Sequence, residues 1–379
     1  MAAPFGVPHF DLADIVRTHR AALESTLNQA QRRVLTDIAQ CRTAALGGHL
    51  DVCTHCGYEH PSYNSCRNRH CPKCQALAQQ RWIDSQRRRV LDVAHFHVVF
   101  TLPAELRPLA RFAPKTVYSL LFKVAAATLQ GFAHRRLHAQ LGLILVLHTW
   151  TKDMRFHPHV HIIATGGGLR KDGTWAAGDP RFLFPVKALA RVFRAKMGEA
   201  LARAERENAF AHFADFADPQ GFERLMQKTR QHAWYVYTKR SFDCAKHVLG
   251  YLGRYTHRVA LSNSRILAVS PDIVVLRTRG KERVSLTPVE MLRRFVLHVL
   301  PKGFRKIRYG GFYAHNKGLI RAWDAVHHSP PPPKMPAADY RVQLLELTQQ
   351  DLRSCPRCGQ ALTSRPLPKA RAPPAQASP

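Results

Sequence analysis

The fold predicted for this chain rests on the stretch His157-Pro-His-Val-His-Ile-Ile-Ala164 and on the run Leu143-Ile-Leu-Val-Leu-His-Thr-Trp150 before it. Both runs are short, apolar and rich in β-branched residues, which favours strands, and the polar link between them is short enough for a hairpin. Side chains two residues apart on a strand share a face, so His159 and His161 should point the same way. A hairpin folded about the middle of the link places His148 opposite His159, with about 5 Å between their Cβ atoms.

Three imidazoles that converge in this way can bind a divalent metal and leave coordination positions open for a substrate oxygen. The alternative is a set of ordinary strand histidines, because with 22 His in 379 residues about one His-x-His is expected by chance. His95-Phe-His97 is a second match, at the head of another strand-like run, 97–102. No hairpin supplies it with a third histidine, so we interpret it as structural.

A second motif is the segment 249–258, in which Tyr251 and Tyr255 are four residues apart. On a helix their hydroxyls share a face, and a tyrosine that is assisted by a metal or a base can act as a covalent nucleophile. Two tyrosines packed into a core are the alternative. The surrounding cations favour a functional role, and they are Lys246, Arg254, His257 and Arg258.

Two metal-ligating histidines in a His-hydrophobe-His sequence, followed by a helix with two tyrosines, form a pattern that resembles the HUH endonuclease superfamily. The closer resemblance is to the two-tyrosine rolling-circle transposases of bacterial insertion sequences, the IS91 family. The segments that carry it are Ser65-Cys-Arg-Asn-Arg-His-Cys-Pro-Lys-Cys-Gln75, Phe96-His-Val-Val-Phe-Thr-Leu-Pro103, His148-Thr-Trp150, His157-Pro-His-Val-His161, Gly166-Gly-Gly168 and Tyr251-Leu-Gly-Arg-Tyr-Thr-His-Arg258.

The resemblance implies that His159 and His161 are two ligands of the metal and that Tyr251 and Tyr255 are the nucleophiles. His148 has the place of the third ligand, and His157 competes for it, although Pro158 favours a supporting or DNA-contacting role for His157. The implied activity is metal-assisted cleavage and rejoining of single-stranded DNA through a 5′-phosphotyrosine, with Mg²⁺ or Mn²⁺. The implied partners are the ends of the chain's own element and target DNA.

The overall charge is consistent with such a partner. The net charge is +31 and the isoelectric point is near 10.5, which predicts a polyanion partner and salt-dependent binding. The N-terminus lacks the pattern of a signal peptide, and the longest apolar run, 141–147, is too short to span a bilayer. We therefore expect no membrane partner and a cytoplasmic, DNA-associated bacterial protein.

Cysteines gather near the N-terminus. The pairs Cys53-Thr-His-Cys56 and Cys71-Pro-Lys-Cys74 have close to the spacing of a structural zinc site. The remaining candidates for a second zinc are Cys41, His49, Cys66 and His70. Cys355 and Cys358 form half a zinc site without an identified partner, and Cys244 is interpreted as a buried apolar residue. The basic residues Arg67, Arg69 and Lys73 predict that this module also contacts DNA.

These segments predict an α+β fold, a ferredoxin-like antiparallel sheet with helices on one face, preceded by a helix at 11–40 and a small zinc-binding module. We expect an N-terminal domain at 1–90, a catalytic domain at 91–325 with an insertion at about 166–235, and a linker, knuckle and disordered tail at 326–379. A replication initiator or relaxase would use the same chemistry. A zinc-dependent DNA-binding protein without catalysis is the alternative from another class.

Overall fold

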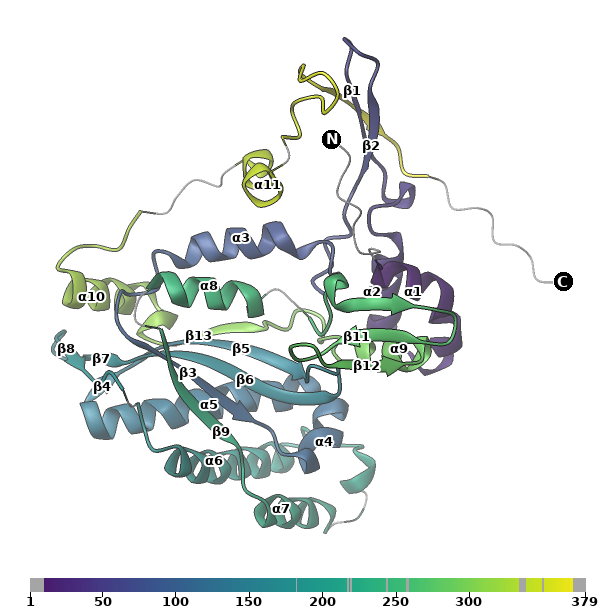
Figure 1. Cartoon of the computed structure of the whole chain (residues 1–379). Coiled ribbons are helices and arrows are strands. Elements are labelled where there is room, and N and C mark those ends of the chain that lie inside the picture. Colours follow the sequence, from purple (N-terminus) through teal and green to yellow (C-terminus); the bar gives the residue numbers. More distant parts are fainter. Residues whose placement is uncertain are drawn as a thin grey trace. The chain divides into compact units, whose positions relative to one another are not determined.

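The computed structural model describes residues 10–181, 183–216, 218, 220–242, 245–256, 259–333, 339–349 and 351–370 (Figure 1). Within these ranges, only the backbone is described for Arg240, Ser241, Lys246, Leu252, Arg254, Tyr255, Thr256 and Thr348. The described residues form two compact units. Unit 1 comprises those of 1–81, 257–299 and 336–379, and unit 2 those of 82–256 and 300–335.

Unit 2 is built on a five-stranded antiparallel sheet with the order β13-β5-β6-β3-β9. Its strands are β3 (His95–Thr101), β5 (Gly142–Trp150), β6 (Phe156–Thr165), β9 (Val236–Phe242) and β13 (Ile307–Gly311). Both β3 and β5 run antiparallel to β6, so they are parallel to each other with β6 between them. The helix α5 (Pro114–Leu137) joins β3 to β5. This is the split βαβ arrangement predicted from the sequence.

Helices cover both faces of this sheet (Figure 1). On one face lie α5 and α6 (Val186–Arg206), where Phe193 of α6 meets Phe100 of β3 edge to face at 4.8 Å between ring centroids. On the other face lies α8 (Ala245–Thr256), whose Val248 joins the buried cluster that includes Ile144 and Ile163 of the sheet. The α+β class is confirmed. The sequence predicted helices on one face of the sheet only. In the structure α8 also covers the second face, the one that carries the histidines.

The remaining elements of unit 2 are short or peripheral. They are η3 (Ala104–Leu106), α4 (Arg107–Phe112), β4 (Ala139–Gln140), β7 (Gly167–Arg170), β8 (Trp175–Ala177), η4 (Ala214–Phe216), α7 (Gly221–Gln231), η6 (Phe312–Ala314) and α10 (Asn316–His327). The strands β4, β7 and β8 form a separate small sheet. The helix α3 (Gln75–Gln86) is divided between the two units.

The alternation of side chains along β6 separates the core from the site. Val160 and Ile162 are fully buried on one face, whereas His159 and His161 point to the other face and are partly exposed. On the core side, Phe100 of β3 is also fully buried. Burial of each such side chain contributes about 1.5–3 kcal/mol, so the apolar face anchors the strand that presents the histidines.

Unit 1 begins with two helices where the sequence predicted one. The helix α1 (Leu12–His19) starts at Asp11, whose side chain accepts a hydrogen bond from the Ala13 backbone N–H. A 3₁₀ segment, η1 (Arg20–Thr26), follows, and α2 (Gln29–Gln40) starts at a capping box made by Asn28 and Gln31. This cap gives the chain a new helix start, which explains the break inside 11–40.

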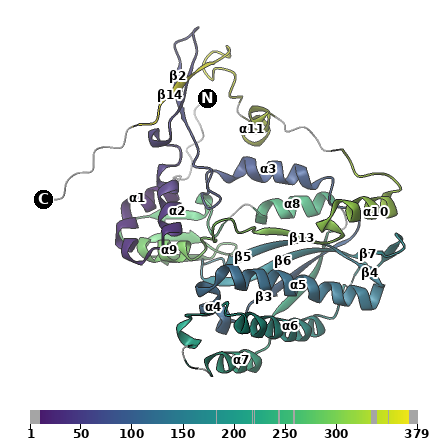
Figure 2. The same ribbon diagram turned by 180° about the vertical axis from the view of Figure 1, so that it is seen from behind.

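Two three-stranded antiparallel sheets complete unit 1. One has the order β10-β11-β12 and includes a hairpin about Ser270-Pro-Asp272. The other has the order β14-β1-β2, so a strand from near the C-terminus pairs with an N-terminal hairpin (Figure 2). The elements are η2 (Ala44–Leu46), β1 (Gly48–Val52), β2 (Glu59–Tyr63), η5 (Asn263–Arg265), β10 (Ile266–Val269), β11 (Val274–Arg277), β12 (Arg283–Leu286), α9 (Pro288–Val296), α11 (Tyr340–Thr348) and β14 (Thr363–Leu367).

No helix in the described ranges combines the length and the apolar character that a bilayer-crossing segment needs.

Candidate functional site

The hairpin β5–β6 brings three histidines together. His148 lies opposite His159 in the strand register, as the sequence predicted. One ligand atom from each of His148, His159 and His161 lies within 4.8 Å of the other two. The ring of His148 is buried, while His159 and His161 are partly exposed. We call these three residues the histidine triad.

The triad is held in the form that a metal requires. His159 Nδ1 lies 2.6 Å from the carbonyl oxygen of His157, and because a carbonyl only accepts, Nδ1 carries the proton and Nε2 keeps its lone pair. Burial lowers the pKa of His159 to about 4 and that of His161 well below its usual value. Both rings are therefore neutral near pH 7, which is the protonation state of an imidazole ligand.

His157 lies beside the triad and outside it. Its Nδ1 accepts a hydrogen bond of 2.9 Å from Arg107 Nη2, and its carbonyl holds His159. Burial, followed by the charges of Arg107 and Arg155, lowers the pKa of His157. The described geometry thus groups His148 with His159 and His161, and it places His157 next to His159 through its carbonyl.

His97, which we interpreted as structural, lies at the centre of the site. Its Nε2 is 2.8 Å from His161 Nδ1 and 3.1 Å from the Tyr251 hydroxyl oxygen. Burial, followed by the charge of Lys239, lowers the pKa of His97 to about 4. His97 therefore does not lie apart from the triad, as the structural interpretation assumed, because β3 pairs with β6 on the side away from β5.

The position of His97 beside the triad follows only from the register in which β3 pairs with β6. There Val99 pairs with His161, so His97 is its diagonal neighbour on the same face. His95, by contrast, fits the structural interpretation. It is fully buried, and its ring nitrogens meet the Val93 carbonyl and the Tyr313 hydroxyl.

The helix α8 carries the two predicted nucleophiles. Tyr251 packs between Phe242 and His97, with both pairs of ring centroids 5.1 Å apart. Tyr255 lies one turn further along α8, and its side chain is outside the described residues. The same holds for the side chains of Lys246 and Arg254 and for the whole of Arg258, Cys244 and His257.

A lysine and an aromatic ring border the triad. Trp150 stacks on His148 at 4.5 Å between ring centroids, and Lys306 Nζ lies 5.0 Å from the centre of the Trp150 ring. Lys306 is buried, and its charge contributes to the lowered pKa of His161. The sequence pointed only to a basic stretch at 302–308 and did not single out Lys306.

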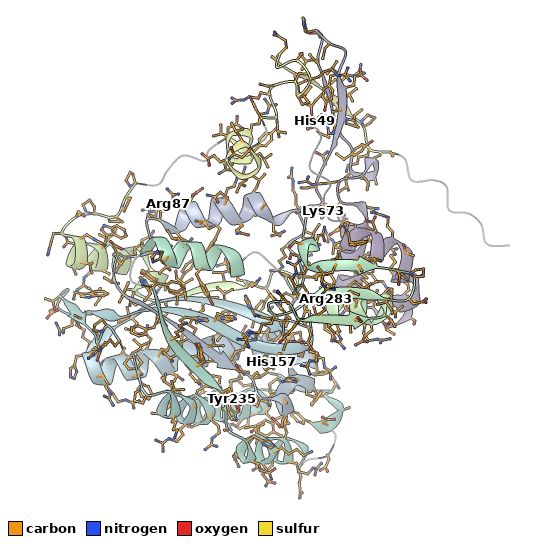
Figure 3. The ribbon with its side chains drawn as sticks, in the orientation of Figure 1. His49, Lys73, Arg87, His157, Tyr235 and Arg283 are labelled. Carbon is orange, nitrogen blue, oxygen red and sulfur yellow. The ribbon has the colours of Figure 1, made fainter. Side chains whose placement is uncertain are left out.

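Two exposed tyrosines lie close to this site. Tyr237 belongs to the edge strand β9, and Tyr235 directly precedes the strand, where its carbonyl still accepts a hydrogen bond of 3.1 Å from the Thr101 backbone N–H. Tyr237 packs edge-on to His97 at 6.4 Å, with 54% of its surface exposed, and Tyr235 is 77% exposed (Figure 3). They are two residues apart, so they share a face of the strand. Exposed aromatic rings beside a cationic site are typical of surfaces that bind unpaired bases.

The cysteines form two clusters whose membership differs from the prediction. One cluster contains Cys41, Cys66, Cys71 and Cys74, and the other contains Cys53, Cys56, Cys355 and Cys358. In the first cluster the Sγ atom of Cys74 lies 3.2 Å from that of Cys41 and 3.5 Å from that of Cys66. The predicted grouping of Cys53 and Cys56 with Cys71 and Cys74 is therefore wrong.

The hairpin explains why these two pairs do not meet. The strand β1 has five residues, so it carries Cys53 roughly 16 Å beyond Gly48, and β2 brings the chain back toward Cys66. His49 and His70 belong to neither cluster. His49 lies along β1 and meets the Asp51 carboxylate at 3.4 Å, whereas His70 meets the Asn68 side chain (Figure 3). The predicted second set of two cysteines with two histidines is therefore also wrong.

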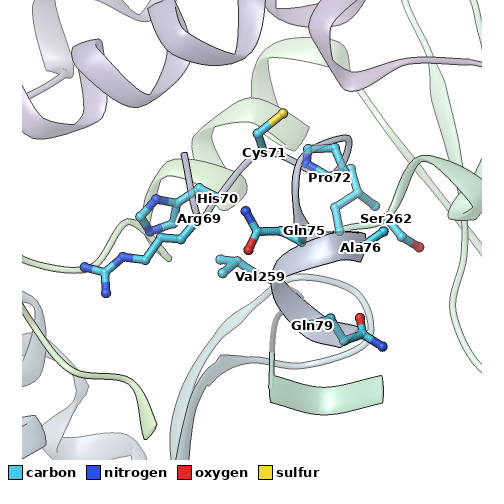
Figure 4. Close-up of a pocket in the computed structure, with 10 residues that line it drawn as sticks. Arg69, His70, Cys71, Pro72, Gln75, Ala76, Gln79, Val259 and Ser262 are labelled. Atoms are coloured by element: carbon cyan, nitrogen blue, oxygen red, sulfur yellow. The ribbon is translucent and has the colours of Figure 1, made fainter. Parts of the chain in front are cut away.

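The three basic residues of this module differ in their surroundings. Lys73 pairs with Asp11 at 2.6 Å, so its charge is already balanced within unit 1. Arg69 is half-buried, burial lowers its pKa, and it lines a pocket of about 140 Å³ together with His70 and Ser262 (Figure 4). Arg67 is exposed.

Comparison with known proteins finds two family matches. Residues 14–102 match a family described as "Transposase zinc-binding domain", and residues 142–319 match one described as "Putative transposase". The chain is 40% identical over 375 residues to "Putative transposase y4qJ" of Sinorhizobium fredii, which covers 93% of this chain and 94% of that protein. It is 30% identical over 326 residues to the "Transposase for insertion sequence element IS801" of Pseudomonas savastanoi pv. phaseolicola, which covers 82% of this chain and 77% of that protein. No solved structure matches the chain significantly.

Proposed function

The chain belongs to the IS91 family of insertion-sequence transposases, and on that premise we propose that it cleaves and rejoins single-stranded DNA at the ends of a mobile element. The main observation in support of the proposal is that one histidine contacts both the proposed nucleophile and a proposed metal ligand. His97 is within hydrogen-bonding distance of both the Tyr251 hydroxyl and His161 of the histidine triad.

The triad is the proposed site of a divalent metal, Mg²⁺ or Mn²⁺. Three neutral imidazoles can hold a divalent ion and leave positions for substrate oxygens, and the choice of Mg²⁺ or Mn²⁺ rests on the family resemblance. When bound, the metal would polarise a phosphate oxygen and neutralise charge that develops in the transition state. The carbonyl contact of His159 Nδ1 fixes the tautomer of that ring, so that its Nε2 is free to face the ion, and His161 Nδ1 is held by its contact of 2.8 Å with His97 Nε2.

Tyr251 is the proposed first nucleophile. Its hydroxyl oxygen attacks the phosphorus, an O–P bond to the tyrosine forms, and the bond from phosphorus to the 3′ oxygen of the preceding nucleotide breaks. The products are a 5′-phosphotyrosine and a free 3′-OH that has taken up a proton. The linkage keeps the energy of the phosphodiester for rejoining, and Tyr255 would accept a second strand before the first is released.

The DNA strand would be held by the charged and aromatic groups around the triad. Lys306 borders the triad and suits a phosphate contact, while Tyr235 and Tyr237 offer two exposed rings for base stacking. A structural zinc on Cys41, Cys66, Cys71 and Cys74 would stabilise the N-terminal module, since all four lie inside the matched zinc-binding domain and fill a tetrahedral shell.

The test is covalent capture on a labelled single-stranded oligonucleotide that carries the end of the chain's own element. Wild type should give a protein-linked band on a denaturing gel with Mn²⁺ and none with EDTA. Tyr251→Phe should remove or strongly reduce the band, and the double variant with Tyr255→Phe should remove it completely. Tyr118→Phe is the matched control, because this tyrosine belongs to α5, packs against Phe304 and has no proposed role at the site, so the band should stay intact. A band that persists in the double variant would refute the tyrosine mechanism.

A further inference from the structure

The C-terminal knuckle meets the tip of the N-terminal hairpin at a second cluster of thiols. Cys53 Sγ lies 3.5 Å from Cys358 Sγ, and Cys56 Sγ lies 3.6 Å from Cys355 Sγ. A disulfide requires about 2.05 Å, so these pairs are not bonded. Tetrahedral Zn–S bonds of about 2.3 Å place neighbouring sulfurs about 3.8 Å apart. The observed separations therefore suit four ligands around one zinc ion.

The two halves of the cluster have the same local fold. In each Cys-x-x-Cys-Gly loop, the first cysteine donates its backbone N–H to the carbonyl five residues later, at 2.8 Å for Cys53 and 2.7 Å for Cys355. The glycine returns a hydrogen bond to the first cysteine, at 3.0 Å for Gly57 and 2.8 Å for Gly359. These glycines have φ values of +68° and +77°, which other residues adopt only with strain. The shared geometry directs both thiols of each loop to one side.

A β-sheet brings the two loops into register. The strand β14 pairs with β1, so that Thr363 lies opposite Val52, the residue directly before the tip loop. Ser364 Oγ donates a hydrogen bond of 2.5 Å to the Asp51 carboxylate, and Arg365 pairs with Glu59 at 3.4 Å. Backbone pairing and side-chain contacts thus support the same alignment independently of the sulfur atoms.

We propose that Cys53, Cys56, Cys355 and Cys358 bind a second structural zinc that fastens the C-terminal segment to the N-terminal module. With four thiolates the shell is closed, so this ion supports folding and takes no substrate. The site completes the module with residues beyond 14–102, the range of the zinc-binding family match. It does not depend on strand cleavage, and its test is independent of that activity.

The first measurement is the zinc content of the purified full chain, determined by native mass spectrometry and by elemental analysis. Wild type should contain two zinc ions per chain. The double variant Cys355→Ser/Cys358→Ser should contain one, and the matched control Cys244→Ser, at the one cysteine that is not among the described residues, should retain two. One zinc ion in wild type, or two in the double variant, would overturn the proposal.

A conservative ligand exchange covers the case in which the double variant fails to fold. Cys358→His keeps a metal ligand at the same position, so it should still bind two metal ions. After replacement of zinc by Co²⁺, the intensity of its thiolate-to-cobalt charge-transfer absorption should fall by the contribution of one thiolate ligand. The ligand-field bands of this variant should also shift. A Co²⁺ spectrum identical to that of wild type would show that Cys358 is not a ligand.

Discussion

Replacement of His97 by alanine should impair catalysis without loss of the fold. The change removes the contacts of 2.8 Å to His161 and 3.1 Å to the Tyr251 hydroxyl. A net value of about 0.5–1.5 kcal/mol for each hydrogen bond gives about 1–3 kcal/mol in total. This corresponds to a fall of about 10–100-fold in the rate of strand cleavage, the range typical of groups that orient metal ligands.

The assay is the single-turnover rate of covalent adduct formation as a function of Mn²⁺ concentration. His97→Ala should lower the maximal rate and raise the Mn²⁺ concentration at half-saturation, because both Tyr251 and His161 lose their support. His97→Gln, which keeps a donor and an acceptor, should recover part of the rate.

His95→Gln is the matched control, since it alters a buried histidine two residues away whose contacts lie outside the triad. It should lower the thermal midpoint and leave the Mn²⁺ dependence unchanged. The reasoning is refuted if folded His97→Ala protein keeps the wild-type rate and Mn²⁺ dependence.

Three further predictions concern charge, packing and salt. Lys306→Met, which keeps the stem of a buried side chain but removes its charge, should weaken oligonucleotide binding about tenfold in a filter-binding assay, whereas unchanged affinity would exclude a phosphate contact. Phe100→Ala should lower the free energy of unfolding in urea by about 3–5 kcal/mol, because Phe100 is fully buried against Phe193, and a loss below about 1 kcal/mol would contradict this packing. With a net charge of +31 and about five phosphates contacted, affinity for a single strand should fall about 100-fold between about 50 and 200 mM salt, and a flat response would argue against phosphate binding.

The sequence predicted the site best where the signal was local. Two short apolar runs and a short link sufficed to place His148 opposite His159, because the register of a hairpin follows from its turn. The spacing of Tyr251 and Tyr255 predicted a helix, and α8 is present. Local capping by Asn28, by contrast, divided a helix whose apolar spacing alone had predicted one continuous segment.

The failures in the site and in the cysteine clusters were long-range. His97 reaches the site through the pairing of β3 with β6, and the strands are separated in the sequence by α5 and β5. The partners of Cys53 lie about 300 residues away, and spacing between cysteines does not reveal such pairings. The edge strand β13 was missed because Ile307-Arg-Tyr-Gly-Gly311 has neither alternation nor a continuous apolar run.

The most direct test of the central claim is to identify the amino acid that becomes linked to DNA. Wild-type adduct formed with Mn²⁺ would be digested with nuclease and protease, and the nucleotide-bearing peptide would be sequenced by mass spectrometry. We expect a 5′-phosphate ester on Tyr251, or on Tyr255 in the second transfer, and no linked peptide from a His148→Ala variant. A phosphate ester on another residue, or binding of a verified element end without any linkage, would contradict the account and favour a zinc-stabilised DNA-binding protein.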